Sequence, residues 1–323
     1  MNDSMQTSDS LQSIDAVITW VDGNDPAHQN KMQRYLKGTA KWQNESFLTR
    51  YRQVNEIEFT VHSILKFAPF IRRVFIVTDA QRPAFLQKKM AAYSKVKVID
   101  HQILFKKNLS VLPVFNSRSI ETKLYAIPGL SERFIYFNDD ILLLKPVSVR
   151  DFFREDKVVL RGRWTSFREG KLHKRLFPRK AGTTSFTQGQ ENSAKKVGFN
   201  RLFRYDHCPQ PLHRSTLESY FLENPTVETQ NCQYRFRNGN QFLCVGLAHH
   251  LEIKNNRSII EHNMRLAFFS SYKKPLCWLQ RQFYRLENNN NKWFLNLQSL
   301  DLCPAKKQAF IMDWLERYYQ LDF

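Results

Sequence analysis

Two neighbouring carboxylates at the end of an apolar, strand-like run are the residues of this chain best placed to do chemistry. Residues 134–137 are apolar and are followed by Asn138, Asp139 and Asp140. In open α/β sheets, ligands bind at the carboxyl ends of the strands, where paired aspartates can hold a divalent cation against a diphosphate. A simple Asn-Asp turn is the alternative, because these residue types also favour turns.

A second group lies just before this run, in the segment that contains Arg118 and Glu121. If residues 117–127 form a helix, then Arg118, Glu121 and Tyr125 share one of its faces. Glu121 is then either a residue of a site or a solvent-facing charge paired with Arg118. The residues alone leave both interpretations open.

A third group is basic and contains His207 and Arg237. Prolines on the carboxyl side of His207 disfavour a helix there, so we expect a loop, and a single loop histidine is often only a surface residue. Cys208 does not make a Cys-His nucleophile pair with His207, because adjacent residues of an extended segment point in opposite directions.

The composition predicts a large folded core and an anionic partner. The 323 residues are 42% hydrophobic and 14% aromatic, and the formal net charge is +19. Such a charge suits nucleic acid, acidic lipid, a nucleotide-linked substrate or a polyanionic product. An RNA-binding protein would need exposed aromatic residues between its cations, whereas Phe and Tyr here fall mostly in apolar periodic runs typical of a core.

Cysteine usage and hydropathy predict a protein of a reducing compartment, soluble or peripheral to a membrane. The cysteines are scattered, odd in number and without a CxxC pair, which argues against a disulfide framework or a zinc knuckle. They are Cys208, Cys232, Cys244, Cys277 and Cys303. The first 13 residues are polar, with no apolar signal region, and no later stretch has the roughly 18 to 20 apolar residues of a membrane span.

Strands that alternate with helices predict an α/β fold with a mostly parallel, doubly wound sheet. The expected strands are residues 14–20, 74–78, 96–100 and 134–137, and the expected helices are 55–67, 83–93, 117–127, 211–221 and 305–319. The stretch 154–206 is rich in Arg, Lys, Gly, Ser and Gln, which favours irregular loop and hairpin. The expected organisation is a disordered segment 1–13, a core 14–150, a basic insertion 151–250 and a C-terminal helical region 251–323.

These motifs resemble the Stealth family, the capsular-polysaccharide sugar-1-phosphate transferases related to the lysosomal-enzyme GlcNAc-1-phosphotransferase. Residues 14–26 (IDAVITWVDGNDP) are similar to its first conserved region. The similarity to the other three regions lies, in order, in residues 52–140, 207–237 and, more weakly, 300–319. The resemblance implies a nucleotide-diphosphosugar transferase (GT-A-like) core with a basic insertion and C-terminal helices.

The resemblance also implies one active site that the spacing of the residues alone does not show. Its catalytic residues are expected to be Glu121, Asp140, His207 and Arg237, and Asp139 and Asp140 are expected to hold Mg²⁺ or Mn²⁺. The residues expected to bind the nucleotide sugar are Thr19, Trp20, Val21, Asp22, Gly23, Arg52, Asn116 and Arg118.

The implied reaction is transfer of a hexose-1-phosphate, such as an N-acetylhexosamine-1-phosphate, from a nucleotide-diphosphate sugar to a hydroxyl of a growing capsular polysaccharide. It requires charge neutralisation and a base rather than a protein nucleophile. Arg237 can bind phosphate oxygens bidentately, and His207 has a suitable intrinsic pKa for a base. Glu121 either orients His207 or binds sugar hydroxyls. A conventional metal-dependent glycosyltransferase is the alternative.

The implied partners are a UDP-sugar donor and an anionic polysaccharide acceptor, without nucleic acid. The implied location is the cytoplasm, with peripheral contact to the inner membrane or a capsule assembly complex. Two positions depart from the family pattern. Gln53 and Asn55 stand where acidic residues are usual, and Cys303 is followed by Pro304-Ala305 instead of Asn-Asp. We therefore expect no catalytic role in the fourth region.

Overall fold

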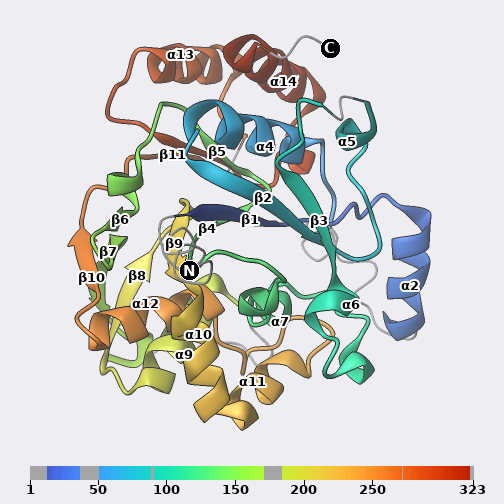
Figure 1. The fold of residues 1–323 in the computed structure, drawn as a ribbon. Coiled ribbons are helices and arrows are strands. Elements are labelled where there is room, and N and C mark those ends of the chain that lie inside the picture. Colours follow the sequence, from blue (N-terminus) through green and yellow to red (C-terminus); the bar gives the residue numbers. More distant parts are fainter. Residues whose placement is uncertain (1–12, 37–50, 89–90, 171–183, 271, 321–323) are drawn as a thin grey trace, which may run out of the picture.

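A five-stranded sheet of order β3-β2-β1-β4-β9 runs through the middle of the molecule (Figure 1). The computed structural model describes residues 13–36, 51–88, 91–170, 184–270 and 272–320. Only β9 is antiparallel to its neighbour, so the mostly parallel sheet predicted from the sequence is confirmed. The strands are β1 Ile14–Thr19, β2 Ile71–Thr78, β3 Val96–Asp100, β4 Arg133–Asn138 and β9 Gln210–His213. Of the segment 1–13 predicted to be disordered, residues 1–12 lie outside the described residues, and Ser13 Oγ lies 2.9 Å from Ser131 Oγ.

Helices cover both faces of this sheet, which explains why its central strands are apolar on both sides. In β1, Ala16 and Ile18 pack with α4 (Glu56–Phe67). Val17 points to the opposite face, where it joins a second cluster with Ile120 of α7 (Ser117–Glu121). α4 and α7 lie on opposite sides of the sheet in Figure 1. The doubly wound arrangement is therefore confirmed.

The predicted helix over residues 117–127 is interrupted. α7 ends at Glu121, and a separate 3-10 turn covers Leu124–Ala126. The Thr122 hydroxyl donates to the carbonyl of Arg118 at 2.7 Å and accepts from Asn231 Nδ2 at 2.8 Å. Such side-chain bonds compete with continued α-helix. The shared face expected for Tyr125 is therefore wrong, and its hydroxyl donates to Glu228 instead.

The stretch 154–206 is more regular than its composition predicts. It contains the ten-residue strand β7 (Lys157–Ser166), the helix α9 (Phe186–Val197) and the strand β8 (Arg201–Tyr205). Arg161 of β7 is only 2% exposed, and its guanidinium lies over aromatic rings. Arginine can bury its stem and stack its planar head, so a basic composition does not require a loop.

The turn at Asp139 and Asp140 leads directly from the central sheet into another sheet. β5 (Ile141–Leu143) pairs with β12 (Phe294–Leu297), which pairs with β11 (Leu266–Phe269). Residues 251–323 therefore contribute strands as well as helices. The predicted C-terminal helix is confirmed as α14 (Ala305–Tyr319), with Ile311, Trp314 and Leu315 buried.

The remaining elements complete the layers around these sheets. The predicted helix over 211–221 begins later, because residues up to His213 belong to β9. Among the described residues, none of the helices has both the length and the apolar character needed to cross a membrane. The other bounds are α2 Pro26–Leu36, α5 Phe85–Lys88, α6 His101–Leu104, α10 Arg214–Glu223, α11 Pro225–Cys232, α12 Cys244–Lys254, α13 Leu276–Glu287, β6 Phe153–Arg154 and β10 Ser258–Glu261.

An ion pair between buried Asp15 and exposed Arg72 joins β1 to β2, and Asp15 also binds the loop before β4. Both carboxylate oxygens of Asp15 accept from Arg72, at 3.0 and 2.7 Å, and the Ser131 amide donates at 2.7 Å. Because Asp15 is fully buried and its loss leaves the Ser131 amide without an acceptor, we expect Asp15→Ala to lower the free energy of unfolding by about 1–3 kcal/mol in urea denaturation. The exposed Arg73→Ala is the control, expected to change it by less than about 0.5 kcal/mol. Equal effects of the two would contradict this role.

Candidate active site

A cavity of about 320 Å³ opens at the carboxyl ends of β1, β2 and β4. Its wall combines these strand ends with α7, the loop before β9 and the segment before α14. Most residues predicted for the site line it: Thr19, Trp20, Val21, Arg52, Asn116, Arg118, Glu121, Asp139, Asp140, His207 and Arg237. Asp22 and Gly23 are not part of this lining.

Asp139 and Asp140 form an acidic corner of the cavity. The turn is held by the Thr60 hydroxyl, which donates to the carbonyl of Asp139 at 2.7 Å, and by the Leu297 amide, which donates to that of Asp140 at 3.1 Å. Oδ1 of Asp140 is buried and accepts no hydrogen bond. Burial raises the pKa of both carboxyls, and the neighbouring charge raises that of Asp139 further.

Glu56, at the start of α4, adds a third acid to this corner. Burial, together with the charges of Asp140 and Asp301, raises the pKa of Glu56 to about 7. Carboxyls gathered in this way repel one another and favour a cation between them. Within the described ranges, no group of three or more His, Cys, Asp or Glu side chains is arranged as a metal site. Mg²⁺ often takes only one or two carboxylates, with water and phosphate oxygens as its other ligands. The unpartnered Asp140 oxygen fits that role.

Glu121 lies deeper in the cavity, next to a hydroxyl chain. The Tyr136 hydroxyl is 3.4 Å from Glu121 Oε1 and 2.8 Å from Thr19 Oγ1. Burial raises the pKa of Glu121 to about 7, although the positive charges of Arg237 and Arg118 oppose the shift. The carboxyl can therefore gain or lose a proton near neutral pH.

Arg237 approaches Glu121 from the segment before α12. Its Nη2 donates to the Ser117 hydroxyl at 3.0 Å, while its remaining donors can face a bound anion. Arg235, two residues earlier, instead stacks its guanidinium 4.6 Å from the ring of Tyr35. The structure thus distinguishes two arginines that the sequence places in one basic segment.

His207 is held between two aromatic rings at the other side of the acidic corner. Its ring stacks on Phe186 at 4.5 Å and on Phe268 at 5.8 Å between centroids. Burial lowers the pKa of His207, although the charges of Asp140 and Asp206 oppose the shift. The imidazole is therefore available in the neutral form, which can accept a proton.

Cys208 is a structural residue. Burial raises the pKa of its thiol to about 12, and Sγ accepts from Gln210 Nε2 at 3.3 Å. A thiol with such a pKa is not a nucleophile at neutral pH. The predicted absence of a Cys-His pair agrees with this environment.

Asn116 and Arg118 are used largely within the protein. Asn116 caps α7 by accepting from the Arg118 amide, and its Nδ2 donates to Gln241 Oε1 at 2.8 Å. The Arg118 guanidinium donates to the carbonyls of Asn238, Thr184 and Ser185. These bonds attach residues 184–241 to α7. Both side chains line the cavity, and their bonds also hold the rest of its wall in place.

Asp22 and Gly23 shape the loop after β1. Asp22 Oδ1 accepts from the Asn24 amide, and the Gly23 amide donates to the Tyr51 carbonyl at 2.8 Å. A Cβ on Gly23 would lie 2.1 Å from that carbonyl oxygen, so only glycine fits this close approach. Tyr51 itself lines the cavity.

Sequence reasoning missed part of the site. The motifs assign no role to Glu56, and they predict none for the fourth region, which begins at residue 300. Glu56 and residues 298–301 nevertheless line the cavity. β12 pairs with β5 and so brings residues 298–301 to the acidic corner, a long-range contact for which the chain carries no local signal.

Comparison with known families agrees with the motifs. Two family descriptions match this chain. Residues 12–40 match Stealth protein CR1, conserved region 1, and residues 50–160 match Stealth protein CR2, conserved region 2. A capsular polysaccharide phosphotransferase, WcwK, of Streptococcus pneumoniae is 31% identical over 261 residues, 71% of this chain and 74% of that protein. The chain belongs to the Stealth family.

Other relatives extend beyond the aligned part. An exopolysaccharide phosphotransferase of Streptomyces coelicolor is 32% identical over 258 residues, 79% of this chain and 42% of the relative. A capsular polysaccharide phosphotransferase of Actinobacillus pleuropneumoniae is 40% identical over 151 residues, 45% of this chain and 40% of the relative. The chain thus spans about two fifths of the length of these two relatives.

Solved glycosyltransferase structures align with much of the chain at low similarity. The galactosyltransferase LgtC, in complex with donor and acceptor sugar analogs, aligns with 95% of this chain and 95% of its own at 10% identity and a TM-score of 0.44. Mouse xyloside xylosyltransferase 1 aligns with 88% of this chain and 97% of its own at 11% identity and a TM-score of 0.42. At such scores the alignments carry no conclusion about the site.

The raised pKa of Glu121 predicts a pH-dependent cost to folding. An acid whose pKa rises from 4.5 to about 7 on folding contributes most stability below pH 4.5 and loses it as the pH rises to 7. At pH 8 we expect Glu121→Gln to raise the free energy of unfolding by up to about 3 kcal/mol, and at pH 4 by almost nothing. Urea denaturation at both pH values measures this, with the exposed Glu223→Gln as control. An equal effect of Glu121→Gln at both pH values would refute the assignment.

Proposed function

We propose that this chain transfers a hexose-1-phosphate from a nucleotide-diphosphate sugar to a hydroxyl of a growing capsular polysaccharide. The product is a phosphodiester, and the nucleotide leaves as a nucleoside monophosphate. The observation behind the proposal is that one cavity is lined by His207, Arg237, Asp139 and Asp140, in a chain of the Stealth family. Burial lowers the pKa of His207, so its imidazole can be neutral and accept a proton. Several relatives are named as capsular polysaccharide or exopolysaccharide phosphotransferases, which supports the proposal.

The proposed reaction needs no covalent enzyme intermediate. The acceptor oxygen attacks the phosphorus that bears the sugar, and the bond from this phosphorus to the bridging anhydride oxygen breaks. The proton of the acceptor hydroxyl passes to neutral His207. Arg237 binds the non-bridging phosphate oxygens, whose charge is large in both the substrate and the transition state.

Glu121 is proposed to contact the donor sugar or the residues that hold it. Arg237 and the Tyr136 hydroxyl lie next to the Glu121 carboxyl. Among the described residues, Glu121 makes no hydrogen bond to His207, whose ring instead stacks on Phe186. Binding of sugar hydroxyls is therefore better supported than orientation of His207. Asp139 and Asp140 would hold Mg²⁺ or Mn²⁺, which would offset the charge of the diphosphate.

The released nucleotide tests the proposal. Purified protein is incubated with UDP-N-acetylhexosamine, other nucleotide sugars and a capsular oligosaccharide, and the products are separated by chromatography and by phosphorus-31 NMR. Phosphotransfer releases the monophosphate and creates a phosphodiester resonance. Release of the diphosphate would instead establish the conventional glycosyltransferase, and no turnover with any pair would overturn both.

His207→Ala tests the proposed base. We expect kcat to fall about 10²- to 10⁴-fold while donor affinity stays within about twofold, because proton transfer occurs only on the way to the transition state. Added imidazole should restore part of the rate to His207→Ala but not to Arg237→Ala. Loss of donor binding in His207→Ala, without rescue by imidazole, would make His207 a ligand of the donor instead.

Metal removal tests the acidic corner. EDTA should abolish transfer, and added Mg²⁺ or Mn²⁺ should restore it. Asp140→Asn should lower the rate at least about 10²-fold and weaken Mn²⁺ binding, followed by electron paramagnetic resonance, since it removes the buried charge but keeps the volume. Asp313→Asn, on the exposed face of α14, is the control. Full activity in EDTA would exclude the metal.

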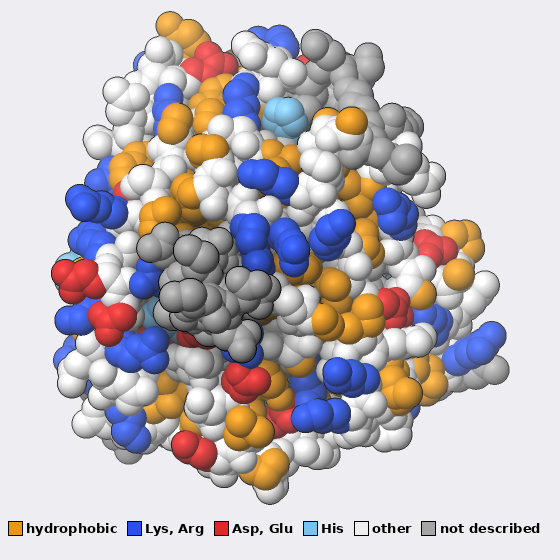
Figure 2. Space-filling model, viewed as in Figure 1, with side chains coloured by type: hydrophobic (Ala, Val, Ile, Leu, Met, Phe, Trp, Pro, Cys, Tyr) orange, Lys and Arg blue, Asp and Glu red, His pale blue; other side chains and the backbone are white. Residues whose placement is uncertain are grey.

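The basic surface is proposed to serve the acceptor. Lys and Arg side chains are spread over the face in Figure 2, between hydrophobic and fewer acidic ones. This distribution suits a long anionic polymer, and it suits an acidic membrane surface or a capsule assembly complex in the cytoplasm. Nucleic acid is not proposed as a partner, because many aromatic rings lie in the cores.

A further inference from the structure

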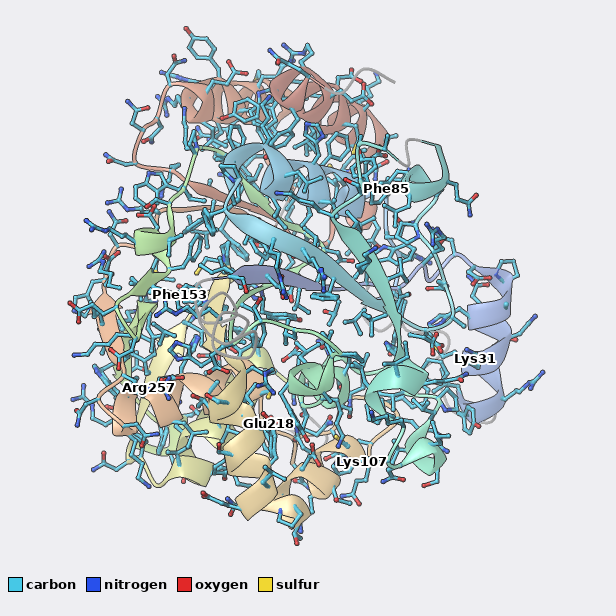
Figure 3. All side chains as sticks on the ribbon, in the orientation of Figure 1. Lys31, Phe85, Lys107, Phe153, Glu218 and Arg257 are labelled. Carbon is cyan, nitrogen blue, oxygen red and sulfur yellow. The ribbon has the colours of Figure 1, made fainter. Side chains whose placement is uncertain are left out.

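Two arginines lie directly opposite each other on the strand pair that leads to His207. Arg163 of β7 pairs with Arg204 of β8 in an antiparallel ladder, and their side chains are 56% and 40% exposed. Both strands lie at the left of Figure 1, and β7 begins beside β6, whose Phe153 is labelled in Figure 3. Like charges opposite each other destabilise a strand pair, so an anion bound between them would be stabilising.

The protein supplies only part of that negative charge, through Asp206. Oδ2 of Asp206 lies 3.9 Å from Arg163 Nη1, and Oδ1 lies 3.7 Å from Arg204 Nε. These distances are too long for hydrogen bonds, and Arg204 Nε is buried without a hydrogen-bond partner. Two guanidinium groups and one carboxylate leave one positive charge over. The arginine pair can therefore accept one more negative charge.

The arginine pair lies next to the proposed base. Asp206 lines the cavity, and His207 follows it in the chain. The His207 ring is held between Phe186, which lines the cavity, and Phe268, which is 46% exposed. The base thus stands at the border between the cavity and the surface. A polymer that presents its last hydroxyl to His207 from solvent would pass close to Asp206 and the two arginines.

The chemistry of the arginine pair favours a phosphodiester. A guanidinium binds paired oxygens of a phosphate with two parallel N–H donors. A phosphodiester has two non-bridging oxygens and one negative charge, so it can accept from both arginines and balance their excess charge. The proposed reaction makes one phosphodiester for each hexose-1-phosphate added. Such a group is therefore present near the growing end of every chain that has already been extended.

We propose that Arg163 and Arg204 bind the phosphodiester nearest the growing end of the acceptor, and that the enzyme thereby favours chains that it has already extended. The last sugar then lies between the arginine pair and His207, with its free hydroxyl at the base. This inference rests on the proposed function, because it assumes a phosphodiester-linked product, and it adds the residues that select the acceptor.

Two matched acceptors test the selection on the unaltered protein. One oligosaccharide has a phosphodiester before its terminal sugar, and the other has an uncharged methylphosphonate in its place. We expect kcat/KM to be at least about tenfold higher for the phosphodiester, mostly through a lower KM, because these contacts are made before the transition state as well as in it. The preference should shrink at high salt, since both arginines are exposed.

The outcomes separate this inference from the proposed function. Equal kcat/KM values for the two acceptors would overturn the inference and leave the transferase intact. Absence of transfer to either acceptor, from any nucleotide sugar, would overturn the proposed function itself.

Variants then assign the residues. Arg163→Gln and Arg204→Gln should each lower the ratio of the two kcat/KM values at least about threefold, and the double variant should bring the ratio close to one. The ratio does not depend on how much protein is folded, because both acceptors are measured on one sample. Arg201→Gln is the control. Arg201 belongs to β8 but points to the opposite face, where its guanidinium lies 6.0 Å from the ring of Trp164. A wild-type ratio in the double variant would overturn the assignment.

Two further measurements distinguish other anions that arginine can bind. An acceptor with a hexuronic acid in place of the phosphodiester tests a sugar carboxylate, and phosphatidylglycerol vesicles test a lipid phosphodiester. We expect the phosphodiester acceptor to be used better than the hexuronic acid acceptor. Equal or better use of the hexuronic acid would overturn the proposal. Weaker vesicle binding by the double variant, with its acceptor ratio unchanged, would assign the arginines to lipid instead.

Discussion

The site depends on holding several carboxyls together in one cavity of the protein. Glu56, Glu121, Asp139 and Asp140 all have raised pKa values, with burial as the largest cause. Like charges at such positions cost folding free energy, which a cation or a cationic side chain can offset. The cost persists because rigid neighbours fix each acid: β4 and β5 hold the aspartates, and α4 and α7 hold the glutamates. Such stored destabilisation is common where a protein needs tuned proton affinities.

The basic region completes the cavity by attaching to α7. Arg118 reaches three backbone carbonyls of this region, while Asn116, Ser119 and Gln241 form a buried polar network. A fully bonded network specifies one geometry, since an altered docking would leave several polar groups unpaired. The same docking brings Arg237 to Ser117 and so to Glu121. The wall and the phosphate-facing arginine are thus positioned by one set of hydrogen bonds.

Some of the basic residues counted in the net charge are structural. Arg118 and Arg161 are almost fully buried, the first bonded to carbonyls and the second stacked on Phe152 and Phe294. Of the 49 Lys and Arg residues, therefore, at least these two do not face solvent. Long-range attraction to an anionic polymer depends on the remaining surface cations, and it is screened by salt. Charges that are buried in the cavity wall, such as that of Arg118, are screened less by salt.

The sequence by itself determined the α/β class, the parallel strands, α4, α14 and the family, because apolar periodicity and contiguous motifs are local signals. It also identified Asp139, Asp140, Glu121, His207 and Arg237 as residues able to do chemistry. Only the tertiary structure decided how they meet. The early end of α7, the regular strands in the basic region and the entry of residues 298–301 into the cavity all arise from contacts between distant segments. Their energies depend on partners that no local window contains.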